Sequence, residues 1–159
     1  MSVAFTREED LEAAAADLAD RPISPHPNLV TPAGLAALDA ALHGARVAYT
    51  AAQTGEHVKS DRTAMARATR DLRYYVARRA NAQLTPPPDH HDVARFGCAV
   101  TFEREDGRRQ TFRIVGEDEA DPAKGAVSYV SPLAQCLLGK RVGDVAVLAG
   151  AEIEIVAIE

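Results

Sequence analysis

The sequence predicts an α+β protein, in which an antiparallel helical hairpin precedes a small antiparallel sheet with one short helix. In the first half of the chain, apolar residues recur at alternating spacings of three and four. From Phe96 onward the pattern changes to the period-two alternation of strands. Proline-rich stretches separate these parts. We therefore expect four segments: a helix and linker (1–28), the hairpin (29–85), a linker (86–95) and a globular domain (96–159).

The amino-terminal segment combines a helix signal with a proline-rich stretch. Thr6-Arg7-Glu8-Glu9 has the form of a capping box, which predicts a helix from Arg7 to about Ala19. Three prolines then follow at 22, 25 and 27. Because each proline fixes φ and removes a donor, this stretch is expected to be an extended linker.

The hairpin prediction comes from a heptad-like seam. Thr31-Pro32 provides a cap and a first helical residue, and Thr54-Gly55 ends the helix. The seam residues between them are Leu35, Leu38, Leu42, Ala45, Tyr49 and Ala52. The rhythm returns in a second helix, expected from about Asp61 to Leu84, whose seam residues are Met65, Ala68 or Thr69, Leu72 and Val76.

Folding the two helices back around His57 places apolar residues opposite one another at each level. Leu42 then faces Leu72, Leu38 faces Val76 and Tyr49 faces Met65. Each arm of about 24 residues projects roughly 35 Å at 1.5 Å per residue.

The globular domain is predicted as five short strands and one helix. Asp106-Gly107 is a hairpin signal between the first two strands, and 126–130 is a third strand. Ser131-Pro132 begins a helix that is apolar enough to lie on a sheet, and Gly139 ends it in the left-handed conformation. The last two strands are expected at 144–148 and 152–158.

Composition limits the classes of function. The net charge of −5 and the pI near 5.5 argue against binding of naked duplex nucleic acid by charge alone, so we expect a protein partner. Cys98 and Cys136 are expected to be buried and reduced. Asp89-His90-His91-Asp92 lacks the spacing of a closed metal site and is interpreted as a solvated linker. The charged amino terminus and the lack of an apolar span predict a cytoplasmic protein without membrane association.

The carboxyl-terminal part resembles the Gre transcript-cleavage factors, which are bacterial proteins that bind RNA polymerase at its secondary channel. The resemblance covers Phe96 to the end and rests on motifs that occur in family order: Gly116-Glu117-Asp118-Glu119-Ala120-Asp121, Ser131-Pro132-Leu133-Ala134, Leu137-Leu138-Gly139-Lys140 and Gly143-Asp144. It implies a globular fold similar to that of FK506-binding prolyl isomerases. Isomerase activity does not follow from fold alone, and aromatic residues to line such a pocket are scarce.

The resemblance also implies a mechanism. Two acids at the hairpin tip hold a transient Mg²⁺ shared with the polymerase, whose own nuclease then cleaves a backtracked transcript. The protein itself is then not an enzyme and holds no tightly bound cofactor. Glu56 and Asp61 are the candidate catalytic and metal-binding acids. The polymerase-facing surface corresponds to Asp118, Glu119, Asp121, Ser131 and Pro132. A monomer is expected, which meets RNA and DNA only within the polymerase complex.

The tip departs from the family pattern, and this leaves alternatives open. The position three residues after Glu56 is Lys59, so Asp61 matches the second acid only with an insertion, and both arms are shorter than in the family. Asp61 could instead cap the second helix. A regulator that occupies the channel without stimulating cleavage is therefore an alternative. Another is a nucleic-acid-binding module that uses a stripe of Arg67, Arg70 and Arg73.

Overall fold

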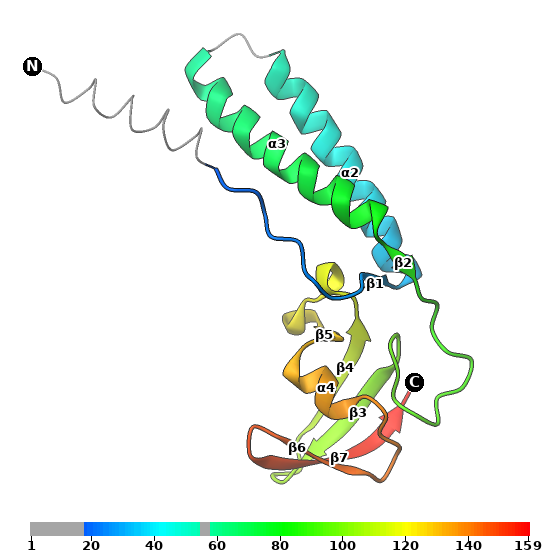
Figure 1. Ribbon diagram of the computed structural model, residues 1–159. Coiled ribbons are helices and arrows are strands. Elements are labelled where there is room, and N and C mark those ends of the chain that lie inside the picture. Colours follow the sequence, from blue (N-terminus) through cyan, green and yellow to red (C-terminus); the bar gives the residue numbers. More distant parts are fainter. Residues whose placement is uncertain (1–17, 55–57) are drawn as a thin grey trace, which may run out of the picture. The chain divides into compact units, whose positions relative to one another are not determined.

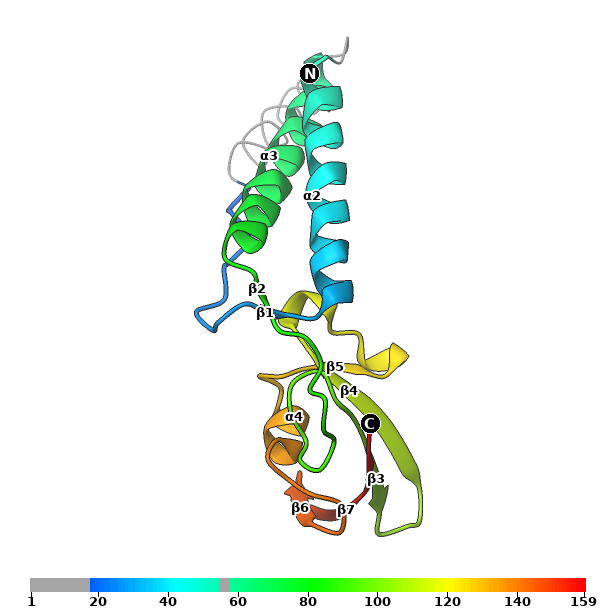
Figure 2. The ribbon, with the colours of Figure 1, turned by 90° about the vertical axis from the view of Figure 1, so that its right-hand side faces the viewer.

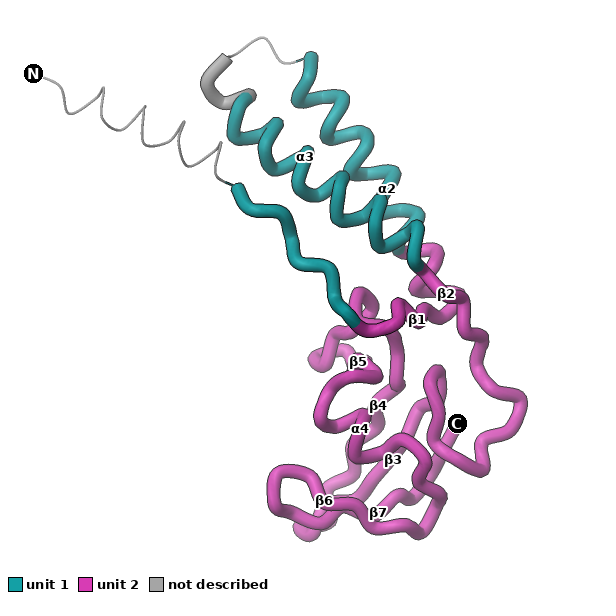
Figure 3. The backbone as a smooth tube through the Cα atoms, in the orientation of Figure 1, with its two compact units in different colours: residues 1–25, 38–81 teal, residues 26–37, 82–159 magenta. Residues whose placement is uncertain are grey.

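The chain forms two compact units. The computed structural model describes residues 18–54 and 58–159, with side chains of the second range from residue 62 onward. One unit comprises residues 1–25 and 38–81, and the other comprises 26–37 and 82–159 (Figure 3). The start of the predicted hairpin segment, 29–37, thus groups with the carboxyl-terminal domain. In the described residues no helix is long and apolar enough to cross a membrane.

The hairpin consists of α2 (Pro32–Gln53) and α3 (Val58–Ala80), of 22 and 23 residues. The two helices run antiparallel and side by side (Figures 1 and 2). Three α2 residues of the predicted seam are buried, namely Leu38, Leu42 and Ala45, and Ala68 is buried on α3. The predicted hairpin is therefore confirmed, and each arm spans about 33 to 35 Å at 1.5 Å per residue.

The second helix differs from its prediction at both ends and in its seam. It begins at Val58 rather than Asp61 and ends at Ala80 rather than Leu84. Val76, which was expected to face Leu38, is 45% exposed, so this level of the predicted seam is wrong. At 3.6 residues per turn Val76 is rotated by roughly 80° around the helix from the buried Ala68, which places it beside the seam rather than in it.

The early end of α3 has a tertiary cause. Residues Gln83–Leu84 form β2, which pairs in parallel with β1 (Leu29–Val30). The amide of Gln83 donates to the Asn28 carbonyl at 2.8 Å, and that of Thr85 donates to the Val30 carbonyl at 2.8 Å. Since Val30 is 1% exposed, this short pairing is part of the folded core rather than a frayed helix end.

The carboxyl-terminal unit is built on a five-stranded sheet of order β5-β4-β3-β7-β6. The expected antiparallel sheet is corrected at one edge, because β5 pairs with β4 in parallel. A parallel neighbour needs a crossover connection, which the two short 3-10 helices between β4 and β5 provide. The elements are β3 (Ala99–Arg104), β4 (Arg109–Val115), η1 (Glu117–Glu119), η2 (Pro122–Lys124), β5 (Ala126–Ser128), α4 (Pro132–Leu137), β6 (Val145–Leu148) and β7 (Ala151–Ile158).

Helix α4 packs on this sheet as predicted, and the core lies between them. Ala134 and Leu137 of α4 are fully buried, as are sheet residues such as Phe102, Ile114 and Ile155. Both cysteines are free thiols. Cys98 is buried as expected, whereas Cys136 on α4 is only half-buried. The Cys136 thiol donates to the Val147 carbonyl at 3.3 Å.

The local signals at the turns and caps are confirmed. Gly107 has a φ of 83° in the hairpin turn, and Gly139 has a φ of 81° after α4. The Ser131 hydroxyl accepts from the Ala134 amide at 3.2 Å, and Pro132 is the first residue of α4. This capped turn and the loop of η1 and η2 carry two of the four motifs described above.

Candidate functional site

The tip of the hairpin lies between the end of α2 and the start of α3. Glu56 falls outside the described residues. Asp61 and Lys59 lie in the first turn of α3, and the structure describes their backbone only. Because α3 begins at Val58, Asp61 is inside the helix rather than at its N-cap, so the capping interpretation is wrong. A carboxylate in a first helical turn is favoured by the helix dipole.

The described residues outside the tip hold no preformed metal site. Among the described residues, no three His, Cys, Asp or Glu side chains group closely enough to hold a metal ion. This includes Asp89-His90-His91-Asp92, where the His91 ring nitrogen instead lies 3.1 Å from the Pro88 carbonyl. All four residues of this segment are exposed, which agrees with the solvated-linker interpretation.

The basic stripe on α3 is partly offset by acids. Arg73 forms an ion pair with Asp20 at 3.2 Å, and Arg70 lies 3.7 Å from the Asp71 carboxylate. Arg67 is exposed. The three arginines do lie along one helix, as predicted. Two of them have acidic neighbours, which reduces the positive potential of the stripe.

Residues 18–25 contact α3 next to this stripe, an arrangement that the sequence did not reveal. The Arg21 guanidinium lies 3.7 Å from the centre of the Tyr74 ring and 3.4 Å from the Asp71 carboxylate. Burial lowers the pKa of Arg21, but the interactions with Tyr75, Tyr74 and Asp71 outweigh burial and raise it. The guanidinium therefore stays charged, as a cation–π contact requires.

The predicted docking residues lie in the loop between β4 and β5 and at the start of α4. Asp118 is exposed at η1. Asp121 precedes η2, where its carboxylate lies 3.7 Å from the Lys124 ammonium and its backbone bridges to Ala126. Pro132 is exposed at the start of α4, beside the capping Ser131. The structure thus places Asp118, Asp121 and Pro132 at the surface of the carboxyl-terminal unit.

Glu119 behaves differently from its neighbours, because its carboxylate holds the start of α2. It accepts hydrogen bonds from the Thr31 amide at 3.0 Å, from the Thr31 hydroxyl and from the Gly116 amide at 3.3 Å. The Thr31 hydroxyl in turn accepts from the Gly34 amide at 3.0 Å. Glu119 is therefore a structural residue, and its assignment to the docking surface stays a prediction.

Two glycines make room for this arrangement. A Cβ atom on Gly34 would overlap the Glu119 carboxylate, and one on Gly116 would overlap the Leu29 carbonyl. Sequence reasoning identified the acidic motif but missed its partner, since Thr31 and Glu119 lie 88 residues apart. The signal that could have found the contact is the pair of glycines, each next to one of the two bonded segments.

Comparisons with known proteins agree with the motifs. The family model "Transcription elongation factor, GreA/GreB, C-term" matches residues 89–159. Transcription elongation factor GreB of Neisseria meningitidis serogroup B is 40% identical over 92 aligned residues, and the match covers 54% of this chain and 56% of that protein. Transcription elongation factor GreA of Alkalilimnicola ehrlichii is 36% identical over 110 aligned residues, and the match covers 62% of this chain and 70% of that protein.

A solved structure and the extent of these matches complete the comparison. The crystal structure of GreA factor homolog 1 of Thermus thermophilus matches with a TM-score of 0.40 and 22% identity, covering 84% of this chain and 99% of that chain. The match spans little more than half the length of the Neisseria relative. The Alkalilimnicola match extends well beyond the carboxyl-terminal domain, and with it the chain belongs to the GreA/GreB family of transcription elongation factors.

Proposed function

We propose that this protein is a transcription elongation factor that acts on RNA polymerase in the bacterial cytoplasm. In this proposal the carboxyl-terminal unit docks on the polymerase and the hairpin enters its secondary channel. The polymerase's own nuclease then cleaves backtracked transcripts, and the factor is not an enzyme. The observation that carries the proposal is a helical hairpin of 22- and 23-residue arms on a chain of this family.

The tip acids supply the chemistry in this proposal. Glu56 and Asp61 would hold Mg²⁺, because carboxylate oxygens are the ligands that this ion prefers. When bound, the metal ion would polarise a phosphoryl oxygen and activate water. The backbone of Asp61 is fixed in the first turn of α3, so the helix sets the depth at which this acid is presented.

Docking is assigned to exposed residues in the loop between β4 and β5 and at the start of α4. Asp118, Asp121 and Pro132 lie at the surface, whereas Glu119 and Ser131 hold the loop and α4 in shape. We therefore expect Asp118→Ala with Asp121→Ala to weaken binding to RNA polymerase while leaving the fold intact.

The runner-up is a regulator that occupies the channel without stimulating cleavage. Lys59 stands between the two acids in the sequence and would offset part of their charge. The short arms would also present the acids less deeply. A metal site tolerates displacements of only about 0.2 Å in ligand distance, so depth alone can abolish cleavage.

One experiment separates these two functions. The protein is added with Mg²⁺ to an RNA polymerase complex stalled in a backtracked register, and an end-labelled transcript is followed. Shortening that is lost in Glu56→Gln and Asp61→Asn, but kept in the control Asp89→Asn, supports cleavage. Binding to polymerase without shortening supports the channel-occupying regulator, and absence of binding contradicts both.

Direct nucleic-acid binding by Arg67, Arg70 and Arg73 is a third candidate and is tested separately. It predicts affinity for bare RNA that falls steeply with salt and is lost in the triple alanine variant. The ion pairs of Arg73 with Asp20 and of Arg70 with Asp71 disfavour it, because an anionic ligand must compete with carboxylates already in place.

A further inference from the structure

Valine side chains gather on the outer face of the edge strand β6. Seven large aliphatic side chains are exposed in the described part of the chain, and three of them lie between 142 and 147. Val145 and Val147 are 53% and 64% exposed, and Val142 is 56% exposed. Since Val145 and Val147 are two residues apart on a strand, they point to the same face of the sheet. Edge strands usually carry charged residues there, so this face is unusually apolar.

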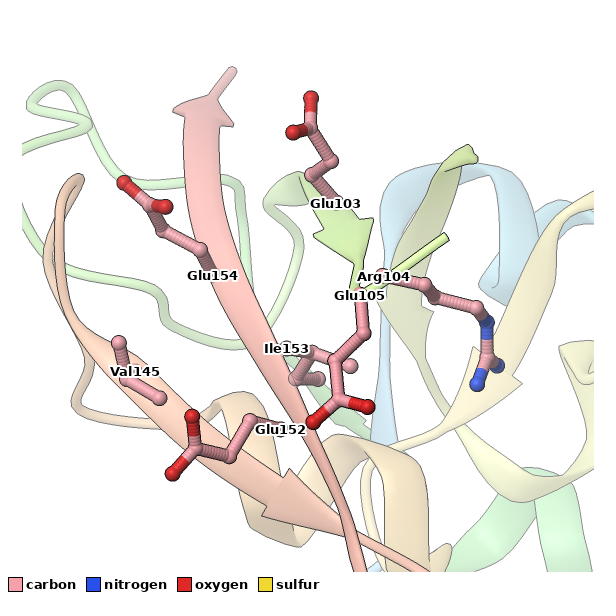
Figure 4. Close-up of a pocket in the computed structure, with 7 residues that line it drawn as sticks. All are labelled: Glu103, Arg104, Glu105, Val145, Glu152, Ile153 and Glu154. Carbon is pink, nitrogen blue, oxygen red and sulfur yellow. The ribbon is translucent and has the colours of Figure 1, made fainter. Parts of the chain in front are cut away.

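Glutamates adjoin the valines across the sheet. The register places Glu154 of β7 opposite Val145 and Glu152 opposite Val147. On its other side Glu154 lies opposite Glu103 of β3. Figure 4 shows Val145 and the glutamates around a hollow of about 230 Å³, which is lined by Glu103, Arg104, Glu105, Val145, Glu152, Ile153 and Glu154. We call Val145, Val147, Glu152 and Glu154 the valine–glutamate face.

The electrostatics of this face are unfavourable in the isolated protein. Like charges directly opposite on neighbouring strands destabilise a sheet, and Glu103 and Glu154 are such a pair. Glu103 forms an ion pair with Arg109, whose guanidinium lies 2.8 Å from its carboxylate. Among the described residues no cation lies within ion-pair distance of Glu152 or Glu154. Arg104 donates to Gln110 at 2.6 Å and extends away from both in Figure 4.

The spacing of the carboxylates indicates which kind of cation could pair with them. They do not converge on one point, and no group of three in the described residues suits a metal ion. Instead Glu152 and Glu154 stand about 6.6 Å apart along the strand, the distance between every second residue of an extended chain. An acidic face also repels phosphates, so nucleic acid does not fit.

We propose that the valine–glutamate face docks an extended segment of another protein that carries lysine or arginine at every second residue. Each such side chain has an aliphatic stem and a charged head. The stems would cover Val145 and Val147, and the heads would reach Glu154 and Glu152. A lysine or arginine side chain can therefore contact both the valines and the glutamates of this face. The valine–glutamate face contains none of the tip acids and none of the predicted docking residues. This proposal is therefore independent of the function proposed above.

The test measures binding of a defined cationic probe to the full chain. A fluorescein-labelled peptide of four Arg-Ser repeats is titrated by anisotropy at low salt, beside a peptide with neutral citrulline for arginine. We expect the arginine peptide alone to bind. Glu152→Gln with Glu154→Gln should weaken it about two- to thirtyfold, the value for losing two exposed charge pairs. Val145→Thr with Val147→Thr keeps β-branching and should weaken it severalfold.

A matched control distinguishes the face from the overall charge. Asp89→Asn with Asp92→Asn removes the same number of charges elsewhere and should leave binding unchanged. Three outcomes overturn the proposal. The arginine peptide does not bind, the Glu152→Gln, Glu154→Gln variant binds it as tightly as the unchanged chain does, or the control variant weakens binding by the same factor. Self-association that the Glu152→Gln, Glu154→Gln variant abolishes also overturns it, because a second copy is then the partner. Circular dichroism checks that each variant is folded.

Discussion

At the scale of single residues, the acidic motif of this family serves the fold as well as any partner. Asp118 and Asp121 face solvent, but Glu119 between them is bonded to Thr31 and Gly116. The motif thus divides its acids between the surface and an internal clamp on the first turn of α2. A substitution at Glu119 is therefore expected to act on stability first.

The clamp can be tested by coupling Glu119 to Gly34. Glu119→Ala should destabilise the carboxyl-terminal unit by about 1–3 kcal/mol, because it leaves the Thr31 amide and hydroxyl without their charged acceptor. Gly34→Ala should also destabilise it, since the new methyl group displaces the Glu119 carboxylate. In the Glu119→Ala background, however, Gly34→Ala should stabilise by about 1 kcal/mol through helix propensity. Hydrogen exchange at the Leu35 and Ile114 amides measures the four combinations.

Gly44→Ala is the matched control for this cycle. Gly44 lies on the same helix, and a Cβ atom there has nothing within 4 Å. It should stabilise by about 1 kcal/mol whether or not Glu119 is present. Additive effects of Gly34→Ala and Glu119→Ala would show that the clamp does not depend on their contact.

At the scale of elements, the β3–β4 hairpin carries a pH-sensitive turn. The Asp106 carboxylate accepts from the Arg108 amide at 3.0 Å and from its guanidinium at 2.6 Å. The backbone hydrogen bond first, and then the side-chain bond, lower the pKa of Asp106. Because the folded pKa is below the unfolded one, the stabilisation is complete above the unfolded pKa and is lost as pH falls through the folded pKa.

An NMR titration of the Asp106 carboxyl carbon checks this prediction. Its midpoint should lie below the ordinary aspartate value, and Asp106→Asn should remove the acid-dependent loosening of the turn at the Gly107 amide. Asn-Gly still suits the turn, so the variant keeps the hairpin at neutral pH. A midpoint at or above the ordinary value contradicts the prediction.

We expect Arg21 to contribute most to the contact of residues 18–25 with α3. Arg21→Met keeps an apolar stem but removes the contacts with Tyr74 and Asp71. The order parameters of residues 20–24 should then fall toward about 0.6 or lower. Arg73→Met is the control: its ion pair with Asp20 joins side chains that are 67% and 61% exposed, and such pairs contribute little. If the order parameters fall equally in both variants, the exposed ion pair of Arg73 contributes as much as Arg21 to this contact, and the prediction is wrong.

The elements also show what a sequence can and cannot predict. The caps at Thr31 and Ser131, the turn glycines and the seam through Leu42 are local signals, and the structure confirms them. The β1–β2 pair was missed, because two residues in each strand leave no periodic pattern. The contacts of Arg21 and Glu119 were missed for a related reason: each depends on a partner 50 or more residues away. At the tip, Glu56 and Asp61 are assigned from the motif alone, and this assignment stays a prediction.

At the scale of the whole molecule, the boundary between the units does not fall between helix and sheet. Residues 26–37 group with the sheet, although 32–37 begin α2. Their links to the carboxyl-terminal unit are specific: Tyr129 donates to the Pro27 carbonyl at 2.5 Å, and Thr31 donates to Glu119 at 3.0 Å. A single helix therefore belongs to two compact units, and its first turn should share the stability of the sheet.

Hydrogen exchange on the full chain tests this division. Leu42→Ala removes a buried seam side chain and should cost the hairpin about 2–5 kcal/mol. Amides within 38–81 should lose protection, while the Thr85 amide, bonded to Val30, and those of 26–37 should keep it. Ile155→Ala in the sheet core should do the reverse and expose 26–37 together with the strands. If Leu42→Ala also exposes 26–37, the first turn of α2 belongs energetically to the hairpin, and Glu119 is not the clamp that joins it to the sheet.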